Sequence, residues 1–368
     1  MDFIEQIFNY MCPAGNGVYT VHTASEHKNK IQNFLYGSNN PDIIWENWAQ
    51  SIEHFANNPS PALIGIASDC GGGILRGANW GPLFIRQNLY QDENHSILFD
   101  LGDIRVIPHI LHDKYLNKET ITSCREALYN NSQIELPVSA LSITEQFCHE
   151  FYKAFPQTPL LALGGDHSVS YPLTKEWIRS RRKQKKKIAI IHFDAHTDLL
   201  EKRLGIDICF GSWTYHILKE LEFPSLVYQI GIRSSGRDKS HWQKTMGVNQ
   251  LWSHEVREKG ANKVAMELIQ SLKRKKIDEL YISFDIDCID SQYVSATGTP
   301  EGNGLQPHEP MLILKELRNH FTISAADIVE VAPFLKTSNN HQTVEPYSTL
   351  SVAQSFVDFF SETFHGDY

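Results

Sequence analysis

The sequence lacks a long apolar run. Its longest apolar stretches reach only about half of the ~20 residues that a membrane-spanning helix needs. The first residues, MDFIEQIFNYMC, carry no positive charge ahead of the apolar ones, so no export signal is expected. Closely spaced cysteine pairs are absent too, because the six cysteines lie far apart without a CxxC motif. This pattern favours reduced thiols in a cytoplasmic protein over a disulfide framework or a zinc knuckle.

An excess of positive charge is also missing. The chain has 34 Lys and Arg against 43 Asp and Glu, which gives a formal net charge of −9. Neither nucleic acid nor a membrane surface is therefore predicted as a partner. The basic run RSRRKQKKK, at Arg179–Lys187, comes before an apolar segment, and cations suit the C-terminus of a helix. We interpret this run as a solvated helix end rather than as a nucleic-acid signal.

Internal repeats and low-complexity linkers are not found, and apolar runs instead alternate with helical patterns. The apolar runs are Ala62–Ala67, Leu160–Gly165, Lys187–Phe193, Ser225–Ile232, Glu279–Ile286 and Ile323–Val331. The helical patterns include Asn262–Arg274, Met311–Asn319 and Thr349–Phe360. Such alternation predicts an α/β fold with a doubly wound, mainly parallel sheet, whose ligands bind at the carboxyl ends of the strands. Residues 1–60, with a short amphipathic helix around Trp45 and Trp48, are expected to form an extension of a main domain at 61–368.

Three of the predicted strands are followed directly by Asp or His. The segments are Leu161–Ser170, Ile190–Leu200 and Tyr281–Asp290. An ionised carboxylate beside apolar surface is costly unless it is paired or bound to a metal ion. A single Asp or His at such a place is usually a turn or helix cap. Three such segments at the ends of separate buried strands instead call for a cation.

The spacing within these segments supports a metal centre. Residues two apart in an extended chain point to one side, so Asp285 can share a point with Asp287, and His196 can share one with Asp194 and Asp198. His167 brings the set to four carboxylates and two imidazoles. This set is too rich in oxygen for a structural zinc site, and it suits a pair of divalent ions such as Mn²⁺, with Ni²⁺, Co²⁺ or Fe²⁺ as alternatives. Two such ions can activate water near neutral pH.

These motifs resemble those of the ureohydrolase family, which contains arginases, agmatinases and related hydrolases of guanidino groups. The resemblance rests on GGDHS, DAHTD and SFDIDCID, and it extends to GIR, ATGTPEGNGL and DIVEVAP, so that it spans about residue 62 to the C-terminus. It implies an arginase-like three-layer sandwich for residues 61–368, two divalent ions and a homo-oligomer, either a trimer or a hexamer. Mn²⁺ is the family default, and some guanidine hydrolases of the family use Ni²⁺.

The resemblance also implies roles for individual residues. One ion would be held by His167, Asp194, Asp198 and Asp285, and the other by Asp194, His196, Asp285 and Asp287, so that Asp194 and Asp285 bridge the ions. Glu330 matches the family glutamate that hydrogen-bonds the guanidinium group, whose planar donors pair well with a carboxylate. Asp198 would pass a proton to the leaving amine. The expected products are urea and either an amine or ammonia.

The sequence departs from the family pattern after the DxHxD motif. Arginases and agmatinases usually have a His-Gly pair there, whose His is considered a proton relay, whereas this chain has Phe210 before Gly211. His216 is a candidate relay, although a structural histidine is the simpler interpretation. The polar stretch with which arginases bind arginine is also missing. Cys209, Phe210 and Trp213 would narrow and dry the pocket, which favours free guanidine or a short alkylguanidine.

Other functions remain open at this point. The chain could instead be an agmatinase or a guanidino acid hydrolase, a hydrolase of an amidine, formimino or amide group, or a catalytically silent metal-binding regulatory protein. A dinucleotide site is suggested by Gly71, Gly73 and Gly77 with Asp92 and Glu93 downstream, but the spacing is not GxGxxG. That glycine segment also resembles the loop that borders the substrate entrance in ureohydrolases.

Overall fold

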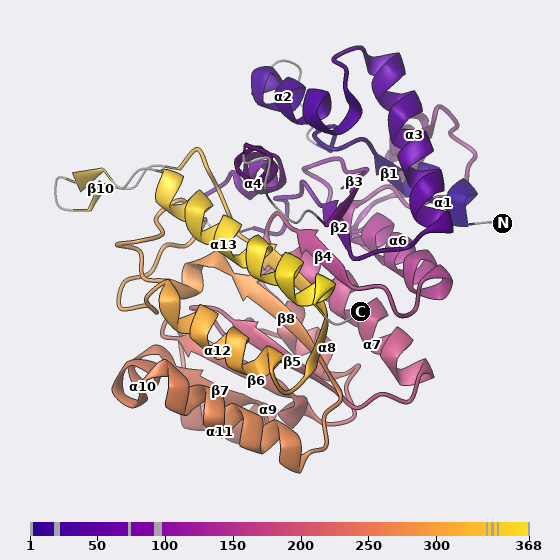
Figure 1. Cartoon of the computed structure of the whole chain (residues 1–368). Coiled ribbons are helices and arrows are strands. Elements are labelled where there is room, and N and C mark those ends of the chain that lie inside the picture. The colour runs from indigo at the N-terminus through magenta and orange to yellow at the C-terminus, as the bar shows by residue number, and fades with distance from the viewer. Residues whose placement is uncertain are drawn as a thin grey trace.

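A nine-stranded sheet forms the centre of the molecule (Figure 1). The computed structural model describes residues 3–17, 23–72, 75–91, 98–335, 338–339, 342–343 and 346–366 of the chain. In sheet order, the strands are β1 (Met11–Cys12), β3 (Phe99–Ile104), β2 (Ala62–Gly65), β4 (Leu160–Leu163), β9 (Thr322–Val329), β8 (Glu279–Asp285), β5 (Ile188–Phe193), β6 (Val227–Ile232) and β7 (Asn249–Trp252). All neighbouring strands are parallel except β1, which is antiparallel to β3.

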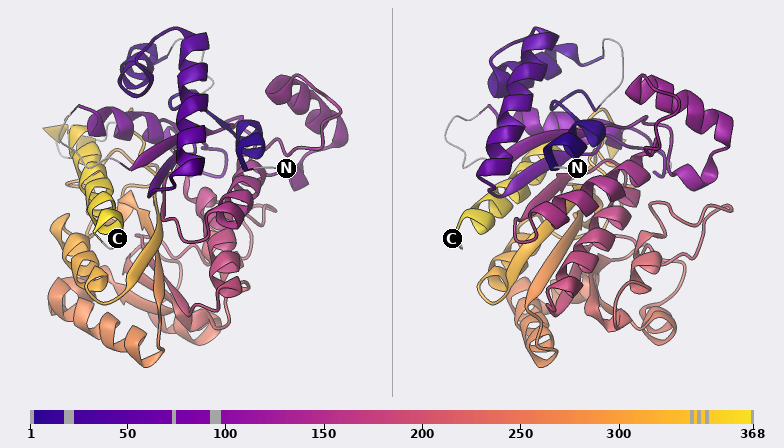
Figure 2. Two further views of the ribbon diagram at one scale, coloured as in Figure 1. Left: turned by 45° about the vertical axis from the view of Figure 1, so that its right-hand side comes forward. Right: turned by 90° about the vertical axis from the view of Figure 1, so that its right-hand side faces the viewer.

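Helices cover both faces of this sheet (Figure 2). One face carries α4 (Gly81–Leu89), α11 (Ala261–Arg274), α12 (His308–Arg318) and α13 (Pro346–His365), and the other carries α1 (Phe3–Tyr10), α6 (Ala140–Ala154), α7 (Ser170–Lys183) and α8 (Trp213–Leu218). The remaining helices are α2 (Ser25–Tyr36), α3 (Pro41–Asn57), α5 (Lys118–Tyr129), α9 (Lys239–Met246) and α10 (Ser253–Lys259). A small hairpin of β10 (Ser338–Asn339) and β11 (Gln342–Thr343) lies outside the main sheet. The predicted three-layer α/β fold is confirmed.

The six predicted apolar runs correspond to β2, β4, β5, β6, β8 and β9. The strands β1, β3 and β7 were not predicted, and they lie at or near the edges of the sheet. In β3, FDLGDI, two acidic residues interrupt the apolar pattern, yet Asp100 and Asp103 are buried because both pair with Arg86 of α4. Because its buried charged residues break the apolar run, such a strand is not recognised from apolar residues alone.

The basic run is only partly solvated. The helix α7 ends at Lys183, as its cation-rich last turn predicts. Arg181 is buried, however, and its Nε lies 2.6 Å from Oε2 of Glu279 at the start of β8. The interpretation of the whole run as solvated was therefore wrong for Arg181, which fastens α7 to the sheet.

The N-terminal residues pack closely against the rest of the chain. β1 adds a strand beside β3, and the indole Nε1 of Trp48 in α3 donates to the carbonyl oxygen of Leu101 at 2.9 Å. The backbone N–H groups of Gly15 and Gly17 donate to the carboxylate of Asp103. The division of the chain into an extension at 1–60 and a domain at 61–368 stays a prediction.

Candidate metal centre

The candidate site lies at the carboxyl ends of β4, β5 and β8, where a doubly wound sheet places its ligands. After β4 the chain turns sharply through Gly165, where a Cβ atom would lie 1.7 Å from the carbonyl oxygen of Ser68. Only glycine allows this close approach. Asp166 then accepts a hydrogen bond from the backbone N–H of Ser168 and starts a short 3₁₀ helix at His167–Val169. This turn directs His167 into the site.

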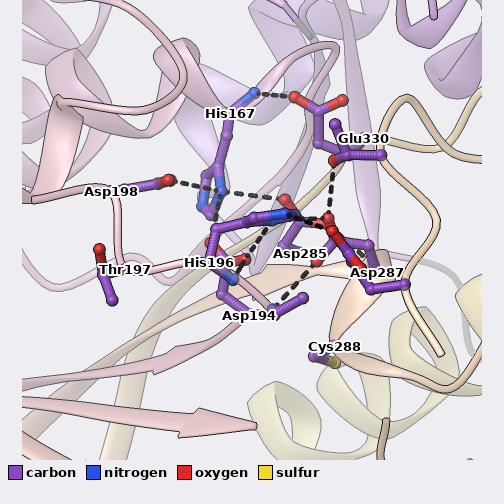
Figure 3. A network of polar contacts seen from close by, with 12 residues as sticks. His167, Asp194, His196, Thr197, Asp198, Asp285, Asp287, Cys288 and Glu330 are labelled. Carbon is purple, nitrogen blue, oxygen red and sulfur yellow. Dashed lines mark hydrogen bonds and ion pairs between the residues drawn. The ribbon is translucent and has the colours of Figure 1, made fainter. Parts of the chain in front are cut away.

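Three carboxylates surround one nitrogen of His167 (Figure 3). Its Nδ1 lies 3.2 Å from Oδ2 of Asp194, 3.2 Å from Oδ2 of Asp198 and 3.1 Å from Oδ2 of Asp285. All four side chains are buried. Nδ1 has no hydrogen-bond partner, whereas Nε2 lies 3.0 Å from Oγ of Ser283. A neutral imidazole that donates from Nε2 leaves a lone pair on Nδ1 for a cation, so these residues fit a divalent ion.

A second group lies on the more open side. Nδ1 of His196 is 3.4 Å from Oδ1 of Asp194 and 3.1 Å from Oδ2 of Asp287. The His196 side chain is 27% exposed, unlike the other predicted ligands. Asp194 thus turns Oδ2 toward His167 and Oδ1 toward His196. This arrangement suits a bridging carboxylate.

The electrostatics of the site also favour a cation. Burial and the neighbouring carboxylates of Asp287 and Asp194 raise the pKa of Asp285 well above its usual range. In the part of the chain that the structure describes, no Lys or Arg side chain pairs with Asp194, Asp198, Asp285 or Asp287. Positive charge from a bound ion would stabilise this arrangement. The structure brings all six predicted ligands together, and their role as ligands stays a prediction.

Glu330 lies beside this cluster at the end of β9. Its backbone has φ of +63°, a conformation that non-glycine residues seldom adopt, and its N–H donates to the carbonyl oxygen of Gly165. Oε1 accepts from the backbone N–H of His167 at 2.8 Å. A Cβ atom on Gly298 would lie 3.0 Å from Oε2, so this oxygen faces the segment ATGTPEGNGL. Burial and the neighbouring Asp166 raise the pKa of the Glu330 carboxyl well above its usual range.

Three residues follow the DxHxD motif where the sequence departs from the family pattern, and they differ in burial and contacts: Trp213, Phe210 and His216. Trp213 is fully buried, and its Nε1 donates to Oδ2 of Asp198 at 2.8 Å. Phe210 is half-buried under the guanidinium group of Arg203, whose carbon lies 4.8 Å from the ring centre. His216 has its Nε2 3.0 Å from the carbonyl oxygen of Glu201, and no interaction with a predicted ligand is observed for its ring within the described residues.

One residue at the site was missed. His192 of β5 is fully buried and places Nε2 2.8 Å from Oδ2 of Asp194. Its ligand atoms, with those of His167, Asp194 and Asp198, lie within 4.8 Å of one another. The signal was available, because His192 precedes Asp194 by two positions and strand residues two apart share a face. It was overlooked because it lies inside an apolar run.

The glycine segment is not arranged for a phosphate in the part that is described. The N–H of Gly71 donates to the carboxylate of Asp166, and the N–H of Gly77 donates to Asp69. A phosphate-binding loop would need these N–H groups free. Gly73, Asp92 and Glu93, which were part of the dinucleotide interpretation, lie outside the described residues.

Comparison with known proteins decides the family. The model of the arginase family matches residues 60–353. The chain belongs to the arginase family. It is 30% identical over 293 residues to a human mitochondrial guanidino acid hydrolase. The aligned residues make up 76% of this chain and 73% of the relative. It is 28% identical over 306 residues to a mitochondrial agmatinase of Gallus gallus, with 78% of each chain covered.

The solved structures agree on the fold. The arginase of Bacillus subtilis superposes with a TM-score of 0.58 at 23% identity, covering 81% of this chain and 98% of that one. The predicted membership of the ureohydrolase family and the arginase-like fold are thus confirmed. The prediction of a hydrolase acting on C–N bonds of linear amidines is also confirmed. None of the helices in the described part of the chain combines the length and apolar character needed to cross a bilayer.

Proposed function

We propose that this arginase-family protein is a binuclear metal-dependent hydrolase that cleaves a C–N bond of a small guanidino compound, releasing urea and ammonia or an amine. The observation that carries the proposal is the arrangement around His167. Its buried Nδ1 has no hydrogen-bond partner and faces three carboxylates, while its backbone N–H donates to Glu330. The proposed cation site therefore lies beside a buried carboxylate that can accept hydrogen bonds.

Six side chains would hold the two ions. His167, Asp194, Asp198 and Asp285 would hold one ion, and Asp194, His196, Asp285 and Asp287 the other. When bound, a pair of divalent ions activates water as a nucleophile near neutral pH. Mn²⁺ is the proposed ion, or Ni²⁺ if the protein is similar to guanidine hydrolases.

Glu330 would orient the substrate. A guanidinium group presents parallel N–H donors that suit a carboxylate, and Oε1 already accepts from His167. The raised pKa of Glu330 reflects its burial near other carboxylates, and a guanidinium cation would relieve this by supplying the opposite charge. Asp198 would then carry a proton to the leaving nitrogen, with its carboxylate fixed by the indole N–H of Trp213.

We also propose that the substrate is guanidine or a short alkylguanidine. Phe210 replaces the histidine of the usual His-Gly pair, and its backbone N–H donates to the carbonyl oxygen of Gly71 at 3.1 Å. This bond ties the segment around Phe210 to the glycine segment. We further propose a cytoplasmic protein that assembles into a trimer or hexamer.

A second candidate is an agmatinase or a guanidino acid hydrolase. The names of two similar relatives favour it, since one is called a guanidino acid hydrolase and the other an agmatinase. Trp213 does not oppose this candidate, because its side chain is fully buried and is engaged with Asp198.

A panel of substrates separates these candidates. The purified full-length chain, loaded separately with Mn²⁺ and Ni²⁺, would be assayed for urea release from guanidine, methylguanidine, agmatine, arginine and 4-guanidinobutyrate. We expect the highest kcat/KM on guanidine or methylguanidine. A clear preference for agmatine or 4-guanidinobutyrate would move the assignment to the second candidate. Metal binding without turnover on every substrate would instead support a silent regulatory protein, and ammonia or formamide without urea would indicate another C–N hydrolase.

A further inference from the structure

A row of buried polar side chains runs from the candidate site across three neighbouring strands. His192 of β5 is the register partner of Gln229 in β6, which is the register partner of Gln250 in β7. All three are buried, and Trp252 at the end of β7 completes the row. Buried polar groups need hydrogen-bond partners, so the donors and acceptors of this row must match along its length.

The two ends of the row have fixed roles. At the outer end, Nε1 of Trp252 can only donate, and it lies 3.1 Å from Oε1 of Gln250. The other amide atom of Gln250, Nε2, therefore donates to Oε1 of Gln229 at 2.8 Å. At the inner end, Nε2 of Gln229 lies 2.6 Å from the carbonyl oxygen of Thr197, which can only accept. Both ends therefore give the amide of Gln229 the same orientation.

This orientation determines the tautomer of His192. Nε2 of Gln229 also lies 3.0 Å from Nδ1 of His192. Since the amide nitrogen donates, Nδ1 must accept and cannot carry a proton. The single proton of the neutral imidazole is then on Nε2, which faces Oδ2 of Asp194 at 2.8 Å. We propose that His192 is a positioning residue whose Nε2–H fixes the carboxylate of Asp194, and that it is not a metal ligand.

His167 is thus a proposed metal ligand, whereas His192 is not. Distance alone would admit His192 to the metal site, because one of its ring nitrogens lies within 4.8 Å of potential ligand atoms of His167, Asp194 and Asp198. A ligand nitrogen must offer a lone pair to the ion. His167 offers one on Nδ1, whereas the nitrogen of His192 that faces Asp194 carries a hydrogen.

The expected consequence falls on the proposed metal centre, on which this inference rests. Asp194 is the carboxylate that turns one oxygen toward each ligand group, so its orientation matters to both ions. Residues that orient a ligand without touching the ion typically contribute a factor of about 10 to 100 to metal affinity or activity. Gln229 and Gln250 would act one and two steps further from the ion.

The test compares His192→Gln with His192→Leu. A glutamine amide can place an N–H close to the position of Nε2–H, whereas leucine cannot donate. Mn²⁺ alone would be titrated calorimetrically into the metal-free full-length protein. His192→Leu should weaken Mn²⁺ binding by about 10- to 100-fold, and His192→Gln should restore most of this loss. As a matched control, Tyr228→Phe removes the hydrogen bond to Ser271 from the neighbouring position of β6 and should leave the affinity unchanged.

Two results of this titration would overturn the inference. If His192 is a ligand, both of its variants will lose one ion per chain. If His192 only packs, His192→Leu will lower stability while the Mn²⁺ affinity stays at the parent value. Failure of the proposed function would look different, because the parent itself would then bind no Mn²⁺.

A spectroscopic measurement does not depend on metal binding or on the folding of any variant. In ¹⁵N-histidine-labelled parent protein, the protonated and unprotonated ring nitrogens are distinguished by their chemical shifts. His192 should show a protonated Nε2 and an unprotonated Nδ1, with and without metal. A protonated Nδ1, or a Nε2 whose shift shows direct coordination when Mn²⁺ is replaced by diamagnetic Zn²⁺, would overturn the inference.

Discussion

Two clusters of buried carboxylates occur on the same sheet, and they are balanced in different ways. In the first, Asp100 and Asp103 of β3 surround Arg86, which is itself buried. Nε of Arg86 lies 2.7 Å from Oδ2 of Asp100, and Nη2 lies 2.9 Å from Oδ1. Backbone N–H groups of Gly15 and Gly17 complete the partners of Asp103. This cluster is satisfied by the chain itself.

In the second cluster, the four carboxylates around His167 and His196 have no Arg or Lys partner among the described residues. Both clusters face the cost of burying negative charge. The first meets it with a fixed guanidinium, which fastens the N-terminal segment and α4 to β3. In the second, we propose that a bound ion offsets it. The first cluster therefore holds the chain together, and the second is the proposed metal centre.

Arg86→Leu should produce the largest change. It leaves Asp100 and Asp103 buried without a cation, and breaking a buried ion pair in this way costs about 3–5 kcal/mol of unfolding free energy. Chemical denaturation monitored by circular dichroism measures this loss. Added Mn²⁺ should not repair it, because the ion binds at the other cluster. A stability equal to that of the parent would contradict the structural role of the first cluster.

Asp285→Asn should preserve the stability of the metal-free protein but weaken metal binding and activity. It removes one negative charge from a crowded site, where burial and like charges raise the pKa of Asp285, so the metal-free protein should lose no stability. Metal binding should weaken and urea release should fall by more than about 100-fold, since a direct ligand contributes more than a residue that only orients one. Metal content and kcat report this together. Retention of both ions with full turnover would exclude Asp285 as a ligand.

Removing metal with a chelator should lower the thermal stability only where the second cluster can bind an ion. An ion present at about 100 times its Kd stabilises the folded state by about 2.7 kcal/mol, so its removal should lower the melting temperature of the parent. Asp285→Asn should show a much smaller shift, and Arg86→Leu, if it folds, should show the full one. Calorimetry with and without chelator provides the measurement. An equal shift in the parent and in Asp285→Asn would mean that the ion binds elsewhere.

Trp213→Phe should give the smallest effect. It keeps an aromatic ring against His167 and His192 and removes only the N–H that fixes Oδ2 of Asp198. We expect kcat to fall by about tenfold, near the lower end of the effects of residues that orient a ligand, with little change in KM. Steady-state kinetics at saturating metal measure this. A rise in KM with kcat unchanged would instead assign Trp213 to substrate binding.

The sequence predicted the second cluster far better than the first. The ligand segments follow continuous apolar runs, and the spacing of Asp194, His196 and Asp198 carries its own signal. Asp100 and Asp103 lie inside a strand, and their partner Arg86 comes from a helix, so only the folded chain shows that the charges meet. For His192, the two-residue spacing could have indicated its place beside Asp194, whereas its contact with Gln229 of the neighbouring strand is visible only in the folded chain. Local sequence patterns do not predict contacts between residues that are far apart in the chain.

The central claim is that the second cluster is completed by two ions. The most direct test counts the divalent metal ions in purified parent protein and in Asp285→Asn by elemental analysis, alongside urea release. We expect two ions per chain in an active parent, and a loss of both metal and activity in the variant. An active parent that contains no divalent ion after exhaustive chelation would contradict it.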